Sequence, residues 1–291
     1  MTAYKIPVLV TRFGDLLGQC GIEEREARSM ARQLVAHRLG VAPKELIMHL
    51  DKELEADDFR DDLNKLASGV PLQHVLGETC FMGLTFKCTP AAHVPRQDSE
   101  PLVEAAIELM RTHPGPIVAD VCCGAGTYGL SLARYLPKAQ VALTDLSAAA
   151  IELARENATL IGVEDRCGFA TGDLFAPLTE AGITCDLVAV NPPYVKTSEI
   201  PDLPPQVRCD PISSLDGGED GMFFYRRIAK EAPFVMADHG WLLLEHGEDQ
   251  QQAICRLLEQ QGFEVCVLIP DYGHRERGIL ARLKTENNNV N

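Results

Sequence analysis

The sequence predicts an α/β fold, a doubly wound and mostly parallel sheet, preceded by a small helical domain. Residues 1–72 place apolar side chains such as Met30, Leu34 and Val35 at helical spacing. After Pro116, short apolar runs alternate with longer amphipathic stretches. Strands that alternate with helices form parallel sheets, because each parallel connection needs a crossover that is usually a helix. The length of 291 residues suits about two domains.

We expect three parts along the chain. Residues 1–72 form the helical domain, and residues 73–95 form a β-hairpin linker whose strands at 74–77 and 82–88 are broken by glycines. Residues 96–291 form the main domain, in which 222–239 is expected to be helical and the last two strands are expected to pair antiparallel. The strands expected in its sheet are 117–121, 141–145, 167–170, 186–190, 240–245, 264–270 and 278–283.

Composition excludes several classes of protein. Lys and Arg number 27 against 42 Asp and Glu, and the net charge of −15 argues against binding nucleic acid or an anionic membrane surface. No uncharged apolar stretch approaches the roughly 18 residues of a membrane span, and the N-terminus lacks a secretory apolar region. The ten cysteines form no Cys-x-x-Cys pair, and the eight histidines form no metal-binding helix face. We therefore expect a cytoplasmic protein with reduced thiols and no metal.

A glycine-rich turn follows the first strand of the main domain. It lies between that strand and a helix, which is where open α/β sheets bind nucleotide-like ligands. Asp145 comes nineteen residues after Gly126 at the end of the next strand, where a carboxylate can take both hydroxyls of a ribose. Glycine spacing alone leaves a dinucleotide and S-adenosylmethionine both open. The residues of the turn are Asp120, Val121, Cys122, Cys123, Gly124, Ala125 and Gly126.

A second turn follows the strand at 186–190. Asn191, Pro192, Pro193 and Tyr194 come directly after it, and two successive prolines end a strand and hold a rigid extended turn. The Asn191 side-chain oxygen and a proline carbonyl can each accept one hydrogen of a planar NH2 group. The Tyr194 ring can cover the flat face of that group. The turn therefore predicts a site for a substrate with an amide or amine nitrogen.

Together the two turns and Asp145 resemble class I S-adenosylmethionine-dependent methyltransferases that act on nitrogen. Further segments resemble the release-factor glutamine methyltransferases in particular, as does a small helical domain followed by a hairpin. These segments are Pro95 to Glu100, Gly172 to Phe175, Asp210 with Pro211, Leu215 to Gly221, and Phe224 to Ile228. The resemblance covers roughly residues 20–283 and implies a seven-stranded sheet.

The resemblance implies transfer of a methyl group from S-adenosylmethionine to the side-chain amide nitrogen of a protein glutamine, with S-adenosylhomocysteine as product. In the family, this glutamine belongs to the Gly-Gly-Gln loop of peptide chain release factors. The positions that match the cofactor site are Asp120, Cys122, Cys123, Gly124, Ala125, Gly126, Asp145, Asp173, Leu174 and Asn191. The substrate would meet Arg96, Asn191, Pro192, Pro193 and Tyr194, of which Asn191, Pro192 and Tyr194 would be catalytic.

Two alternatives share this chemistry. Cys122 stands where the family has glycine and resembles a sister group that methylates a glutamine of a ribosomal protein, so that substrate, or a small-molecule amide or amine, stays open. Residues 95–100 and 215–228 fit the release-factor branch better. A DNA adenine methyltransferase would have to flip a base and grip phosphates, which the net charge of −15 disfavours. The oligomeric state is left open.

Overall fold

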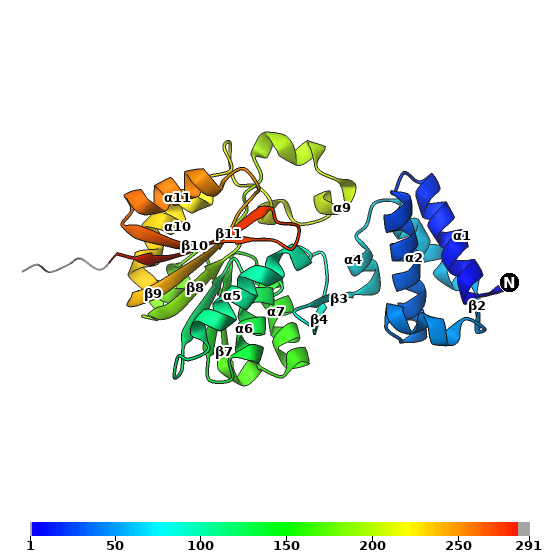
Figure 1. Cartoon of the computed structure of the whole chain (residues 1–291), viewed down its shortest axis with the longest axis horizontal. Coiled ribbons are helices and arrows are strands. Elements are labelled where there is room, and N and C mark those ends of the chain that lie inside the picture. The colour runs from blue at the N-terminus through cyan, green and yellow to red at the C-terminus, as the bar shows by residue number, and fades with distance from the viewer. Residues whose placement is uncertain (1, 285–291) are drawn as a thin grey trace, which may run out of the picture. The chain divides into compact units, whose positions relative to one another are not determined.

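The computed structural model describes residues 2–284, which fall into two compact units (Figure 1). One unit holds the chain up to Gly77 together with Pro204–Cys209, and the other holds Glu78–Leu203 and the chain from Asp210 onward. Among the described residues, no helix is long and apolar enough to cross a membrane.

The first unit is mainly helical. Its helices within residues 6–76 pack around one apolar core that includes Leu9, Leu34 and Phe59, and the Phe13 and Phe59 rings lie 5.0 Å apart. Gly40 ends the second helix in the left-handed conformation. The elements are α1 (Ile6–Gln19), α2 (Glu24–Leu39), α3 (Arg60–Ala67), α4 (Leu72–Leu76), α9 (Pro205–Arg208), and the short helices Pro43–His49 and Ala56–Phe59.

One expectation for this part of the chain was wrong, and one feature was missed. Residues 74–76 belong to helix α4, not to a strand, and Gly77 ends that helix with a φ of 76°. A short antiparallel pair, β1 (Ala3–Lys5) with β2 (Glu53–Glu55), was not expected. Strands of three residues are too short to show a clear alternation of apolar and polar side chains.

The second unit begins with a hairpin and contains a seven-stranded sheet. The hairpin pairs β3 (Glu78–Phe81) with β4 (Leu84–Lys87). In the large sheet the spatial order is β10, β11, β9, β8, β5, β6, β7, and only β11 runs antiparallel to its neighbours. The strands are β5 (Ile117–Val121), β6 (Gln140–Asp145), β7 (Cys167–Thr171), β8 (Cys185–Val190), β9 (Met236–Glu245), β10 (Phe263–Pro270) and β11 (Glu276–Leu283). The predicted fold class is confirmed.

Helices cover both faces of this sheet (Figure 1). Alternate residues of β8 enter different cores: Leu187 packs with α5 (Glu100–Met110), α6 (Thr127–Tyr135) and α7 (Ala148–Ile161), whereas Val188 packs with α8 (Ala176–Glu180), α10 (Phe223–Glu231) and α11 (Gln251–Gln260). This burial on both faces explains why the strand is an unbroken apolar run.

Most strand bounds in the second unit lie within two residues of the expectation, and the largest difference is at the start of β9. Helix α10 ends at Glu231, the short helix Ala232–Val235 follows, and β9 begins at Met236, four residues before Gly240. Asp238 and His239 are exposed at the start of this strand, so their polarity hid it in the sequence. The chain order reverses between β5 and β8, which makes their carboxyl ends the switch point where such sheets bind ligands.

Candidate active site

The two predicted turns leave the sheet side by side. Val121 of β5 and Val190 of β8 are paired in parallel register, so Cys122 and Asn191 follow neighbouring strand ends at one edge of the sheet. This edge is the switch point of the fold. The glycine-rich turn and the Asn-Pro-Pro-Tyr turn therefore border a common site.

The glycine-rich turn has an unusual backbone. Cys122, Gly124 and Gly126 have φ values of 58°, 52° and 82°, in the left-handed region that favours glycine. The Cys123 N–H donates to the Thr144 carbonyl at 3.0 Å, and the Gly126 N–H donates to the Cys123 carbonyl at 2.7 Å. A non-glycine residue at Cys122 is strained there, and the surrounding bonds hold it in place.

Asp145 closes the turn from the neighbouring strand. Its Oδ2 accepts the Gly124 N–H at 2.9 Å, and its Oδ1 accepts the Ser147 N–H at 2.9 Å. The side chain is only half-buried, and each carboxylate oxygen keeps a second acceptor position. These free positions fit the two hydroxyls of a ribose, so the residues present suit a nucleoside-containing cofactor.

Asp120 lies under the turn and is buried. Its Oδ2 accepts the Gly129 N–H at 2.7 Å, which joins the end of β5 to the first turn of α6. A Cβ atom at Gly129 would lie 2.9 Å from the Asp120 Cβ, so only glycine permits this approach. Burial raises the pKa of Asp120 to about 7, opposed by the Gly129 hydrogen bond and reinforced by the charge of Asp145. With an exposed fraction of 2%, Asp120 supports the turn from within.

The two vicinal thiols of the turn stay neutral. Burial raises the pKa of both Cys122 and Cys123, and the carboxylates Asp145 and Asp120 act in the same direction. A thiolate is the reactive form of cysteine, so neither residue is suited to act as a nucleophile. All ten cysteines of the chain are free, and Cys123 is among those that are buried.

Asp173 and Leu174, both predicted to bind the cofactor, differ in burial: Asp173 is exposed and Leu174 is buried. The Asp173 carboxylate is exposed and accepts a hydrogen bond from Arg227 Nη1 at 2.9 Å. Leu174 is buried with a φ of 46°, and its carbonyl accepts from Thr144 Oγ1 at 3.4 Å. Leu174 can therefore offer a ligand its backbone, while its side chain belongs to the core.

In the Asn-Pro-Pro-Tyr turn, the prolines are buried, whereas Asn191 and Tyr194 are half-buried. Within residues 2–284 the Asn191 side chain makes no hydrogen bond. Val195 then pairs with a second loop, donating to the Leu215 carbonyl at 2.9 Å and accepting from the Gly217 N–H at 2.7 Å. A Cβ atom at Gly217 would lie 2.7 Å from the Tyr194 Cα, so a glycine is needed for the loop to approach the turn.

The Tyr194 phenol lies among buried charges. Burial raises its pKa to about 12, and the Glu245 charge adds to this effect, whereas the charges of Arg277 and Arg96 oppose it. Tyr194 is therefore neutral at physiological pH. The structure thus brings the predicted substrate residue Arg96 close to the turn.

Arg277 belongs to an ion-pair network that sequence reasoning missed. Its Nη2 lies 3.7 Å from Asp271 Oδ2 and 4.0 Å from Asp98 Oδ2. Arg275 bridges the same carboxylates, with Nη2 2.9 Å from Asp98 Oδ2 and Nε 2.8 Å from Asp271 Oδ2. The network joins the segment after Arg96 to the β10–β11 hairpin. More than 170 residues separate Asp98 from Arg275, so no local pattern predicts their ion pair. The only signal in the sequence is the grouping of Asp271, Arg275 and Arg277.

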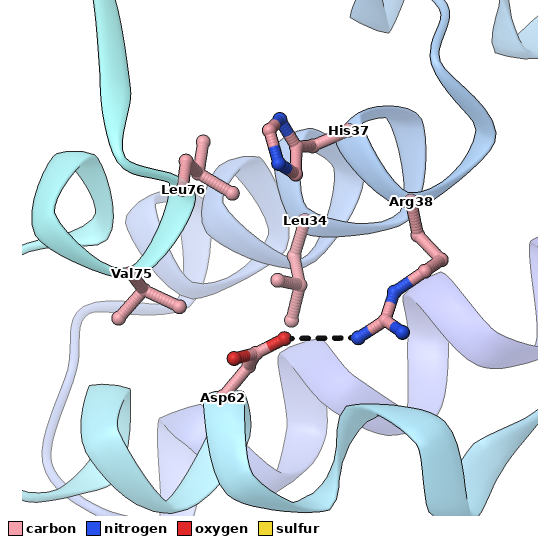
Figure 2. Close-up of a pocket in the computed structure, with 6 residues that line it drawn as sticks. All are labelled: Leu34, His37, Arg38, Asp62, Val75 and Leu76. Atoms are coloured by element: carbon pink, nitrogen blue, oxygen red, sulfur yellow. Dashed lines mark hydrogen bonds and ion pairs between the residues drawn. The ribbon is translucent and has the colours of Figure 1, made fainter. Parts of the chain in front are cut away.

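A separate cavity of about 230 Å³ lies in the first unit (Figure 2). Leu34, Val75 and Leu76 form its apolar lining, and the Arg38 guanidinium pairs across it with Asp62 at 3.2 Å. His37 completes the wall. None of the predicted site residues lines this cavity. In the described part of the chain, no group of three or more His, Cys, Asp or Glu side chains could hold a metal ion.

Comparison with protein families matches both parts of the chain. The family described as methyltransferase small domain matches residues 103–203, which include both turns and Asp145. The family described as PrmC N-terminal domain matches residues 9–77, which lie in the helical unit.

Individual proteins agree with these matches. The hMettl16 catalytic domain in complex with MAT2A 3′UTR hairpin 1 shares the fold, with a TM-score of 0.56 and 18% identity over 70% of this chain and 76% of that one. A release factor glutamine methyltransferase of Moorella thermoacetica is 39% identical over 89% of this chain and 92% of the relative. Another, of Geobacter sulfurreducens, is 35% identical over 92% of this chain and 93% of the relative. The chain thus belongs to the release factor glutamine methyltransferase family.

Proposed function

We propose that the protein transfers a methyl group from S-adenosylmethionine to the side-chain amide nitrogen of a glutamine in the Gly-Gly-Gln loop of a peptide chain release factor. The observation that carries the proposal is the pairing of Val121 with Val190, which sets the glycine-rich turn beside the Asn-Pro-Pro-Tyr turn. Release factor glutamine methyltransferases with 39% and 35% identity over most of the chain support this substrate.

The cofactor would lie against the glycine-rich turn. The free acceptor positions of Asp145 would take the ribose hydroxyls, and the open backbone at Gly124 would let the cofactor approach closely. Asp173 and the backbone of Leu174 lie on the next loop of the same sheet edge and would complete the site. S-adenosylmethionine, when bound, supplies an electrophilic methyl group on a sulfonium.

The substrate amide would be held by the other turn. The Asn191 side-chain oxygen and the Pro192 carbonyl would each accept one hydrogen of the glutamine NH2, and the Tyr194 ring would cover its face. In residues 2–284, neither of these oxygens receives a hydrogen bond from the protein. Both acceptors are thus available to a substrate.

These residues would act by positioning and electrostatics. An amide nitrogen is a weak nucleophile because its lone pair is delocalised onto the carbonyl. Fixed oxygen atoms around the NH2 would align the nitrogen with the methyl group and stabilise the positive charge that develops on it. Tyr194, whose pKa is raised to about 12, keeps its proton throughout. The proton released from the nitrogen would leave after methyl transfer.

The helical part at residues 1–72 would add contacts to the protein substrate, and the reaction would take place in the cytoplasm, where release factors act.

S-adenosylmethionine labelled in its methyl group tests the proposal when offered to a purified release factor. Label should enter the intact factor and be missing from a variant whose loop glutamine is replaced by alanine. Label in neither factor would contradict the proposal, and label in a ribosomal protein instead would assign the enzyme to the sister group.

A further inference from the structure

The uncharged side chain of Gln250 holds the last residue of the Asn-Pro-Pro-Tyr turn by its backbone carbonyl. Gln250 lies between the end of β9 and the start of α11. Its Nε2 donates to the Tyr194 carbonyl at 3.0 Å and to the Gly221 carbonyl at 3.1 Å, and its Oε1 accepts the Gly247 N–H at 2.9 Å. The amide thus joins three backbone segments, two of which are distant in sequence.

Two glycines make room for this amide. A Cβ atom at Gly221 would lie 2.6 Å from Gln250 Nε2 and also 2.6 Å from the Tyr194 carbonyl oxygen. A Cβ atom at Gly247 would lie 3.0 Å from Gln250 Oε1 and 3.4 Å from Tyr194 Cδ2. Real Cβ atoms do not approach other atoms as closely as 2.6 Å, so a side chain at Gly221 would displace Gln250 or the Tyr194 carbonyl, whereas a side chain at Gly247 would crowd the Gln250 amide. The three segments are therefore packed around Gln250.

The turn has few other means of attachment. Pro192 and Pro193 have no N–H to donate, so the turn must be held through its carbonyls and through the residues that follow it. Val195 is paired with Leu215 and Gly217, which hold the far side of the turn. Gln250 holds the Tyr194 carbonyl from the side of β9, which is the strand next to β8. Only a primary amide offers two donors and an acceptor at this reach without a charge.

We propose that Gln250 is a positioning residue for methyl transfer, one that fixes the backbone of Tyr194 and through it the acceptors that hold the substrate amide. The proposal rests on the proposed function for its catalytic consequence. The three hydrogen bonds of the Gln250 side chain, which we call the clamp, form without substrate. Methyl transfer depends on near-linear alignment, so a shift of the turn by a fraction of an ångström lowers turnover.

Replacing Gln250 by glutamate tests the clamp, because the carboxylate keeps the shape and loses both donors. Gln252→Glu is the matched control, since Gln252 is exposed in the first turn of α11, two residues after Gln250, and the change in charge is identical. We expect Gln250→Glu to lower kcat on the release factor by about 10- to 100-fold while the Kd for S-adenosylmethionine changes by less than about threefold. The control should match the parent protein. If the glutamate variant does not fold, Gln250→Met takes its place in the test, because methionine has a similar length and also lacks both donors.

Hydrogen exchange measures the clamp without any substrate. The amides of Val195 and Gly217, which pair beside the turn, should exchange faster in Gln250→Glu and Gln250→Met than in Gln252→Glu. Unchanged exchange, or a kcat equal to that of the control, would overturn the role of Gln250. Failure of the parent protein to label any release factor would count against the proposed function alone.

Discussion

The Asp120 carboxylate accepts a hydrogen bond from the Gly129 N–H at 2.7 Å inside the core, directly beneath the glycine-rich turn. Because burial raises the pKa of Asp120 to about 7, the folded protein binds a proton that the unfolded chain releases near pH 4. The stabilising contribution of this proton is complete below about pH 4 and is lost as the pH rises through about 7.

Asp120→Asn should therefore remove this dependence on pH. The asparagine is neutral at every pH and its side-chain oxygen can still accept the Gly129 N–H. The free energy of unfolding of the variant, measured relative to the parent by urea denaturation, should rise between about pH 4 and 7, by at most about 1.4 kcal/mol per pH unit. A difference that is constant over this range would show that Asp120 titrates normally.

The close approach of Gly217 to Tyr194 gives a second prediction. Gly217→Ala would set a Cβ atom 2.7 Å from the Tyr194 Cα and 2.8 Å from the Tyr194 carbonyl carbon, both of which are backbone atoms. We expect a loss of about 1–3 kcal/mol in the free energy of unfolding, or an equivalent displacement of the turn with lower turnover. Gly168→Ala is the control, since a Cβ there meets no atom within 4 Å. Equal thermal stability together with equal turnover of the two variants would contradict the packing argument.

How far the sequence determines this site depends on the range of each interaction. The two turns were predicted because Cys122 and Asn191 directly follow apolar runs, a pattern that is local in the sequence. The contacts of Asp98, Gln250 and Arg277 were missed because their partners are brought near by the strand order, which no local pattern contains. The early start of β9 was missed because the exposed Asp238 carries no periodic apolar signal.

Asp145 provides a test of the cofactor site. Asp145→Ala removes the acceptors proposed for the ribose and also the partners of the Gly124 and Ser147 N–H groups. We expect the Kd for S-adenosylmethionine to rise by about 10- to 100-fold, since each hydrogen bond to a charged group contributes about 1.5–3 kcal/mol. Calorimetry with S-adenosylhomocysteine should show a similar loss, because the two molecules share the ribose. A loss confined to one of the two would place Asp145 away from the sugar.

Asn191 is the corresponding test of the substrate site. Asn191→Ala removes one of the two oxygens proposed to hold the glutamine NH2, and nothing in residues 2–284 depends on that side chain for a hydrogen bond. Turnover on the release factor should fall by about 100- to 1,000-fold, as when a single catalytic hydrogen-bonding group is removed elsewhere. Binding of S-adenosylmethionine should weaken much less. Near-normal turnover would exclude Asn191 from the reaction.

Arg277 gives the last prediction, through its place between Tyr194 and the carboxylates Asp98 and Asp271. Arg277→Met removes a largely buried charge and leaves Arg275 as the main partner of both carboxylates. We expect a loss of about 1–3 kcal/mol in the free energy of unfolding, because a buried partner is left less well compensated.

Arg282 lies on the same strand and forms an exposed pair with Glu264, so Arg282→Met is the matched control. An exposed ion pair contributes about 0–1 kcal/mol, and the control should stay within that range. Turnover should also separate the two variants, because only Arg277 reaches the surroundings of Tyr194. Equal stability and equal turnover would mean that the network is a surface feature, and that the β10–β11 hairpin plays no part in shaping the substrate site.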